Sequence, residues 1–216
     1  GNIVHFGAAG SVVVSNVTQN ATATSNNLST TLNDTTLQAG NSAVTVNVAG
    51  NVGVSVGGDS NVALGGSVVV MNTNNGADID ANNLKVNDGS LTMTAQNEAD
   101  AWAASADGAI SSSMSFGGAV AVNRVQNTAS IALNNATLKN TSSARLHAKD
   151  DSALWTLAGN VTVGAGDKGA GVSGAVAYSI SGREDSPGTA VSVNGITVTN
   201  ETAAGEADIS TDIDVK

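Results

Sequence analysis

The stretch Gly66-Ser-Val-Val-Val70 decides the fold because close copies of it recur along the whole chain. The copies begin at positions 10, 66, 118 and 174, so the intervals are 56, 52 and 56 residues. β-Branched residues favour extended backbone, and a strand phrase repeated at this interval predicts a stack of similar units instead of one closed core. The other copies are Gly10-Ser-Val-Val-Val14, Gly118-Ala-Val-Ala-Val122 and Gly174-Ala-Val-Ala-Tyr178.

Aligned on this phrase, residues 1–216 form one repeat segment with four copies. An amide pair follows the phrase at a fixed distance in the first three copies, and Asn194-Gly195 takes its place in copy 4 after four extra residues. Residues 182–188 supply the extra length and hold the only proline, so we interpret them as a loop inserted at a turn. Because the chain starts inside a repeat without an initiator Met, we expect it to be a piece of a longer protein. The copies cover approximately residues 7–64, 65–116, 117–173 and 174–216, and the amide pairs are Asn26-Asn27, Asn82-Asn83 and Asn134-Asn135.

Apolar and polar residues alternate between the phrase and the amide pair, which is typical of a half-buried strand. Each copy holds about six such strand candidates, centred about nine residues apart. With three strands per turn, this spacing predicts an all-β parallel β-helix with about two coils per 52–56-residue repeat. The segment Asn97–Ser105 has the best local helix propensity, yet it aligns with strands in neighbouring copies, and we expect a strand there.

An antiparallel barrel or sandwich is the competing architecture. Its hairpins need Asn-Gly or Asp-Gly turns at regular strand-to-strand intervals. Such dipeptides occur, at Asn75-Gly76 and Asp88-Gly89 among others, but their spacing is irregular. The sequence therefore favours the β-helix.

The composition excludes several functional classes. Only 2% of the residues are aromatic and 12% are charged, and the net charge is −10. Eight Lys and Arg residues without a cluster do not support nucleic-acid binding. The acidic balance opposes docking on anionic lipid, and no apolar stretch reaches the ~18 residues of a membrane span. The chain has no cysteine, which excludes a disulfide scaffold and a cysteine-ligated metal site.

Beyond these residues, the repeat resembles a known family. The phrase Gly117–Asn123, the pair Asn134-Asn135 and the later Ala158–Val161 resemble the repeats of leukotoxin-type filamentous adhesins, which are similar to filamentous haemagglutinins. The resemblance covers essentially the whole chain. It implies a right-handed β-helical shaft that is exported through an outer-membrane transporter by type V, two-partner secretion. It also implies a secreted or cell-surface location and a role in adhesion or host-cell damage.

Four residues are candidates for ligand binding. Asp78 and Asp80 lie two apart on one predicted strand, so both side chains should point outward, about 6.5–7 Å apart. Pectinase-like β-helices place acidic residues in this way, although two solvated carboxylates on a sheet are the simpler interpretation. Trp102 and Trp155 fall at nearly equivalent places in copies 2 and 3. We expect them to fill the interior or cover a turn, but exposed indoles there would be the best glycan-binding candidates.

Other side chains do not predict a metal or a cofactor. Asp208, Asp212 and Asp214 alternate along another predicted strand, but one stripe supplies too few oxygens for calcium. No Arg or His is spaced to assist Asp78 and Asp80, and two carboxylates that point the same way do not form a catalytic pair. We therefore expect no cofactor, no metal and no catalysis.

These observations predict a structural or adhesive β-helical shaft segment of a secreted bacterial adhesin or leukotoxin-like surface protein. Its job would be to extend a distal tip and present a repetitive polar surface to a host-cell receptor or glycan. The alternative function is a β-helical protein that binds or cleaves polysaccharide with Asp78, Asp80 and Trp102. Self-association through open coil ends or side faces is a further expectation.

Overall fold

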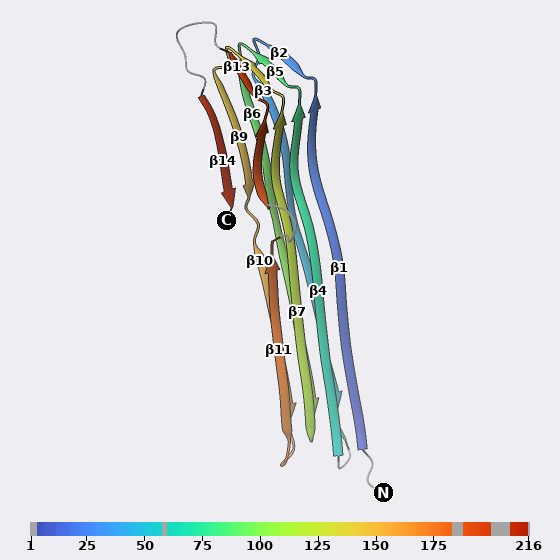
Figure 1. Ribbon diagram of the computed structural model, residues 1–216. Helices are drawn as coiled ribbons and strands as arrows, with labels where there is room; N and C mark the ends of the chain where they lie inside the picture. The colour runs from blue at the N-terminus through green and yellow to red at the C-terminus, as the bar shows by residue number, and fades with distance from the viewer. Residues whose placement is uncertain (1–3, 58–59, 183–187, 200–207, 216) are drawn as a thin grey trace.

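The computed structural model describes residues 4–57, 60–182, 188–199 and 208–215, and the only regular structure in these ranges is β-strand (Figure 1). Parallel strands form three sheets, which are the sides of a flattened β-helix. Two long sheets, A and C, pack face to face, and the short sheet B connects them at one end (Figure 1). We call this the sheet B end and the opposite end the far end. The chain is therefore a parallel β-helix, as the sequence predicts.

The strands of each sheet come from successive repeats. Sheet A consists of β1 (Val4–Asn26), β4 (Ser60–Asn82), β7 (Met114–Asn134), β11 (Ala170–Ser181) and β12 (Thr189–Asn194). Sheet B consists of β2 (Ser29–Thr31), β5 (Lys85–Asn87), β8 (Thr137–Lys139) and β13 (Thr197–Thr199). Sheet C consists of β3 (Thr35–Ser55), β6 (Ser90–Ser111), β9 (Ser143–Asp150), β10 (Leu154–Gly164) and β14 (Asp208–Val215).

The repeat phrases stack in register, but the predicted number of coils was wrong. Val12 pairs with Val68, Val68 with Val120 and Val120 with Val176, so the four residues form one line across sheet A. The pairing is direct, with no intervening coil. One repeat therefore makes one coil, not two, and each coil adds about 4.8 Å to the stack.

The coils are wide because the strands are long. β1 and β4 each contain 23 residues, so each spans more than one of the strand candidates that were predicted about nine residues apart. The glycines and asparagines that seemed to divide them continue as strand, since the amides bond along the ladder. Asn72 Nδ2 donates to Asn16 Oδ1 over 2.9 Å, and Asn75 Nδ2 donates to Asn127 Oδ1 over 3.0 Å. Such amide ladders satisfy polar groups between coils, so a polar residue does not need to end a strand.

The predicted asparagine turns are confirmed at the sheet B end. Asn27, Asn83 and Asn135 have φ of 58°, 55° and 54°, and they follow the last residues of the sheet A strands. Asn83 Nδ2 donates to Asn27 Oδ1 over 3.1 Å, which extends the ladder around the corner. Asn tolerates this left-handed backbone better than most residues. In coil 4 the position is Gly195, with φ of 68°.

The interior differs between the two halves of the slab. Near sheet B it is apolar, and Leu84, Leu91, Leu133 and Leu146 are fully buried. Toward the far end it is filled with small and polar side chains such as Ser67, whose Oγ lies 2.6 Å from Ser105 Oγ. Large apolar residues of the far half point outward instead, so the usual arrangement of a core and a polar surface is reversed there.

The prediction that the extra segment of copy 4 lies at a turn was wrong, and the predicted strand that contains Asp208 is present. The extra segment of copy 4 is inserted within a strand position and not at a turn, because β11 ends opposite Val125 and β12 resumes opposite Ala129 of the same strand β7. Residues 183–187 lie outside the described residues. β14 confirms the strand that contains Asp208, although the side chains of residues 201–216 are also outside the description.

Candidate functional site on the outer face of sheet C

Asp78 and Asp80 lie on the outer face of sheet A, near the sheet B end. Their partners in neighbouring strands are Thr22 and Ser130 for Asp78, and Thr24 and Ala132 for Asp80. Ser130 Oγ donates to Asp78 Oδ1 over 2.6 Å, while Asp80 is exposed. Both side chains point outward, as predicted, and their registered neighbours provide hydroxyl and methyl groups.

Trp102 and Trp155 lie on the other side of the slab, on the outer face of sheet C. They are direct partners in β6 and β10, and their rings stack with centroids 5.1 Å apart and planes inclined by 15°. Their exposed fractions are 43% and 55%. The expectation that they fill the interior or cover a turn was wrong. The structure does not bring Asp78 and Trp102 together, because sheets A and C face each other and their outer faces point in opposite directions.

The tryptophan pair closes one end of an apolar groove along β6. The floor of the groove is made by Ala104 and Gly108, which are smaller than their partners on β3 and β10, and by Ala106, whose partners are both glycine. Beside the indoles, Val48 and Leu157 form the walls of a hollow of about 310 Å³. Toward the far end a second hollow of about 600 Å³ lies between Val52, Ile110, Val161 and Val163.

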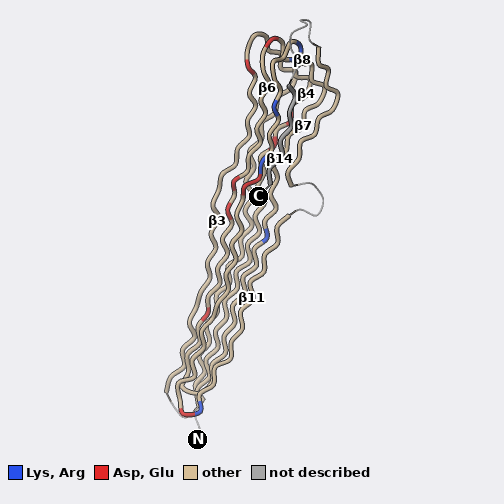
Figure 2. Tube along the Cα trace, turned by 90° about the vertical axis from the view of Figure 1, so that its left-hand side faces the viewer, with Lys and Arg blue, Asp and Glu red and all other residues tan. Residues whose placement is uncertain are grey.

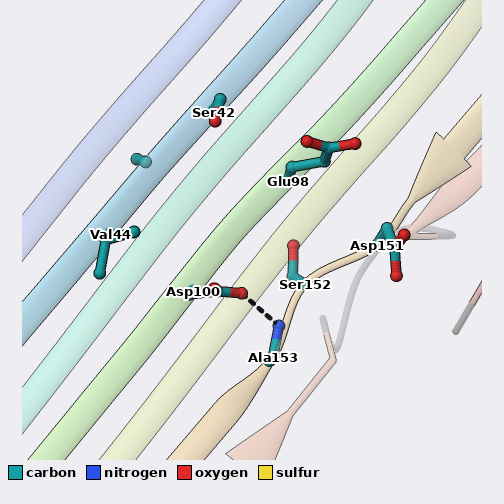
Figure 3. Close-up of a pocket in the computed structure, with 8 residues that line it drawn as sticks. Ser42, Val44, Glu98, Asp100, Asp151, Ser152 and Ala153 are labelled. Atoms are coloured by element: carbon teal, nitrogen blue, oxygen red, sulfur yellow. Dashed lines mark hydrogen bonds between the residues drawn. The ribbon is translucent and has the colours of Figure 1, made fainter.

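Figure 3 shows the residues that line a polar pocket of about 440 Å³. The pocket lies on the sheet B side of the tryptophan pair, because its residues Glu98 and Asp100 precede Trp102 on β6. Glu98 and Asp100 contribute to it from β6, on the same outward face as Trp102 two residues further on. β3 supplies the opposite wall, and the irregular segment between β9 and β10 supplies Asp151 and Ser152. The pocket and the indoles are therefore parts of one continuous surface, which we call the acidic–tryptophan surface.

Internal hydrogen bonds hold the polar side of this surface. Asp100 Oδ1 accepts from the Ala153 amide over 2.9 Å, as drawn in Figure 3. Ser152 Oγ accepts from the Ala99 amide over 2.9 Å, which fixes the segment against β6. Lys149 Nζ lies 2.9 Å from Asp151 Oδ2 in an ion pair. Glu98 accepts a hydrogen bond from Gln96. The carboxylates of Glu98 and Asp100 can also accept hydrogen bonds from a hydroxyl-bearing ligand.

Sequence reasoning found the tryptophans but missed the pocket. Glu98, Asp100 and Trp102 occupy alternate positions of one predicted strand, so the sequence already indicates that their side chains lie on one face. Asp151 and Ser152 carried no such signal, because only the stacking of coils brings them beside β6. Among the residues that the structure describes, no group of three or more His, Asp or Glu side chains is close enough to hold a metal ion.

No protein-family model matches the chain, and neither a curated protein nor a solved structure matches it. A search for membrane-spanning segments within the described ranges finds no helix of sufficient length and apolarity.

Proposed function

We propose that this chain is an adhesive β-helical segment of a secreted bacterial surface protein of the adhesin or leukotoxin-like kind. Its ligand is a glycan or another hydroxyl-rich receptor on the host-cell surface, bound at the acidic–tryptophan surface. An outer-membrane transporter would export the parent protein. The observation that carries this proposal is the exposed, stacked pair of Trp102 and Trp155 beside the pocket of Glu98 and Asp100.

The dimensions of the stack favour display over extension. Strands of 23 residues make each coil about 75 Å wide, whereas each repeat of 52–56 residues lengthens the stack by only about 4.8 Å. A shaft built from such coils would need more than fifty residues for each ~4.8 Å by which it extends a distal tip. The same coils give two broad sheet faces, on which equivalent residues of successive repeats lie side by side. We therefore assign this segment to presenting a surface.

The chemistry of the acidic–tryptophan surface suits a sugar. Indole rings provide a broad apolar surface with a polar N–H, and exposed ones bind the C–H face of a pyranose ring. Carboxylates next to the rings, from Glu98 and Asp100, match the hydroxyl edge of the same ring. The stacked geometry also requires little ordering on binding, because each indole already supports the other.

The alternative function, polysaccharide cleavage with Asp78 and Asp80, has less support. A glycosidase needs two carboxyl groups that face each other across a bound sugar. Asp78 and Asp80 point the same way from one strand, and Trp102 lies on the opposite sheet. We propose that the chain is not an enzyme.

The test is binding of the purified chain to a panel of immobilised neutral and sialylated oligosaccharides, followed by adhesion of chain-coated beads to epithelial cells. We expect Trp102→Ala and Trp155→Ala each to weaken binding about tenfold or more, which corresponds to ~1.4 kcal/mol. Leu32→Ala is the control, because Leu32 is an exposed apolar residue in the turn after β2 at the sheet B end, outside the outer face of sheet C. Failure of the chain to bind any glycan, or equal binding by all three variants, would contradict the proposal.

A further inference from the structure

The outer face of sheet A is apolar over five consecutive rows of its far half. It comprises the alternate positions from Phe6 to Val14 of β1 and their registered partners on β4, β7 and β11. These five rows of four residues contain only apolar side chains and glycine, apart from the phenol of Tyr178. Phe6, Val12 and Val176 are 64%, 70% and 57% exposed. Apolar patches of several hundred Å² are rare on monomeric proteins and mark interaction sites. We call this surface the sheet A apolar face.

A row of glycines crosses the middle of this face. Gly10 pairs with Gly66 and Gly118 with Gly174, all within extended strands. A Cβ added at any of the four would come no closer than 3.7 Å to the rest of the chain. Their own fold therefore does not require glycine here. The row forms a trough between the row of Ala8 and the row of Val12, and a strand glycine without an internal reason fits close approach by another backbone.

We propose that the occupant of the sheet A apolar face is a second copy of this chain. Five rows at about 6.6 Å and four strands at about 4.8 Å give a face of about 600 Å². Two copies packed face to face would bury about 1,200 Å², which reaches the range of stable protein interfaces. The corresponding face of sheet C has three described strands at this level, β3, β6 and β10, and would bury only about 900 Å² by the same arithmetic.

The rows fit each other in an antiparallel pair. A two-fold axis that lies between the glycine row and the Val12 row, perpendicular to the strands, places the valines of each copy in the glycine trough of the other. Such an isologous contact closes on itself and forms a dimer. It leaves the acidic–tryptophan surface of both copies free, because that surface belongs to sheet C.

The charge distribution favours the same arrangement. Charged residues gather toward the sheet B end and at the turn of the far end, and they are sparse between (Figure 2). The chain carries a net charge of −10, so a parallel pair would bring its acidic halves together. In the antiparallel dimer the two sheet B ends point away from each other, and only the apolar halves overlap. Repulsion between the copies is therefore small.

Sedimentation velocity of the 216-residue chain over a range of concentrations tests the proposal. We expect a reversible dimer. Val12→Asp places a carboxylate in the interface and should raise the dissociation constant about a hundredfold or more. Val54→Asp is the matched control, since it makes the same change at a 52% exposed, outward valine of β3, on sheet C and outside the sheet A apolar face. It should leave the dimer unchanged.

Gly174→Val provides a second test that does not add charge. A Cβ at Gly174 meets nothing within 4 Å, and valine suits a strand, so the far-UV circular dichroism should be retained. The side chain fills the trough, and we expect the dissociation constant to rise about tenfold or more. This variant decides the question if Val12→Asp does not fold.

Three results would overturn the proposal. The first is a chain that stays monomeric at all concentrations. The second is a dimer that Gly174→Val and a folded Val12→Asp leave unchanged, because the interface would then lie elsewhere. The third is flotation of the chain with phosphatidylcholine vesicles that Val12→Asp abolishes, because lipid would then be the occupant.

Discussion

Two identical substitutions at opposite levels of burial test the assignment of inner and outer faces. Leu133 is 0% exposed in the core of the sheet B half, whereas Leu157 is 69% exposed on the outer face of sheet C. Leu133→Ala removes apolar contacts of three carbon atoms, worth about 0.8 kcal/mol each, and leaves a cavity. We expect it to lower the free energy of unfolding by about 3–4 kcal/mol. Leu157→Ala should lower it by less than about 0.5 kcal/mol.

Guanidinium denaturation followed by far-UV circular dichroism measures both differences. Stacked coils need not unfold in one step, so the comparison uses variants with the same transition shape and slope. A one-residue slip in register would exchange the two faces of a strand. Equal losses for the two variants, or a loss below about 1 kcal/mol for Leu133→Ala, would therefore refute the inner and outer assignment.

Three further predictions concern the turns and the candidate sites. Asn83→Gly should change the free energy of unfolding by less than about 1 kcal/mol. Asn83→Val should lower it by about 2 kcal/mol or more, because a β-branched residue is strained at a φ of 55° and loses the amide bond to the next coil. The double variant Asp78→Ala, Asp80→Ala should keep the circular dichroism spectrum of the unmodified chain. The unmodified chain should release no reducing ends from pectin, glucan or uronan polymers. Depolymerisation that the double variant loses would show instead that the chain is an enzyme. Trp155→Phe should remove the near-ultraviolet signal of the coupled indoles, and an unchanged spectrum would show that Trp102 and Trp155 do not stack at 5.1 Å in solution.

Much of the architecture was available from the sequence. The strand phrases, their recurrence at 52–56 residues and the amide pairs predicted a parallel stack, the line of valines through Val68 and the left-handed turns at Asn27 and Asn83. These features are local or strictly periodic, so backbone preference and spacing determine them. The strand at Asn97–Ser105 was also predicted, because alignment with the other copies outweighed its helix propensity.

The number of coils and the orientation of the faces depended on the tertiary structure. A glycine or an asparagine within a strand pattern can mark a turn or can continue the strand, and only pairing with the next coil decides between them. Asn72 continues a strand because Asn16 accepts its amide proton, whereas Asn83 turns the chain. Period-two alternation likewise shows which residues share a face, but not which face points inward.

The candidate site shows the same division. The sequence determined that Trp102 and Trp155 occupy equivalent repeat positions and that Glu98 and Asp100 share a parity with Trp102. Only the stacking of coils decided that the two indoles meet and that Asp151 lies beside β6. The physical reason is that each repeat cannot bury its own faces and takes its neighbours in space from the coils above and below it. Contacts between residues more than fifty positions apart arise from this pairing of coils. The local sequence determines only that a segment is a strand and which of its residues share a face.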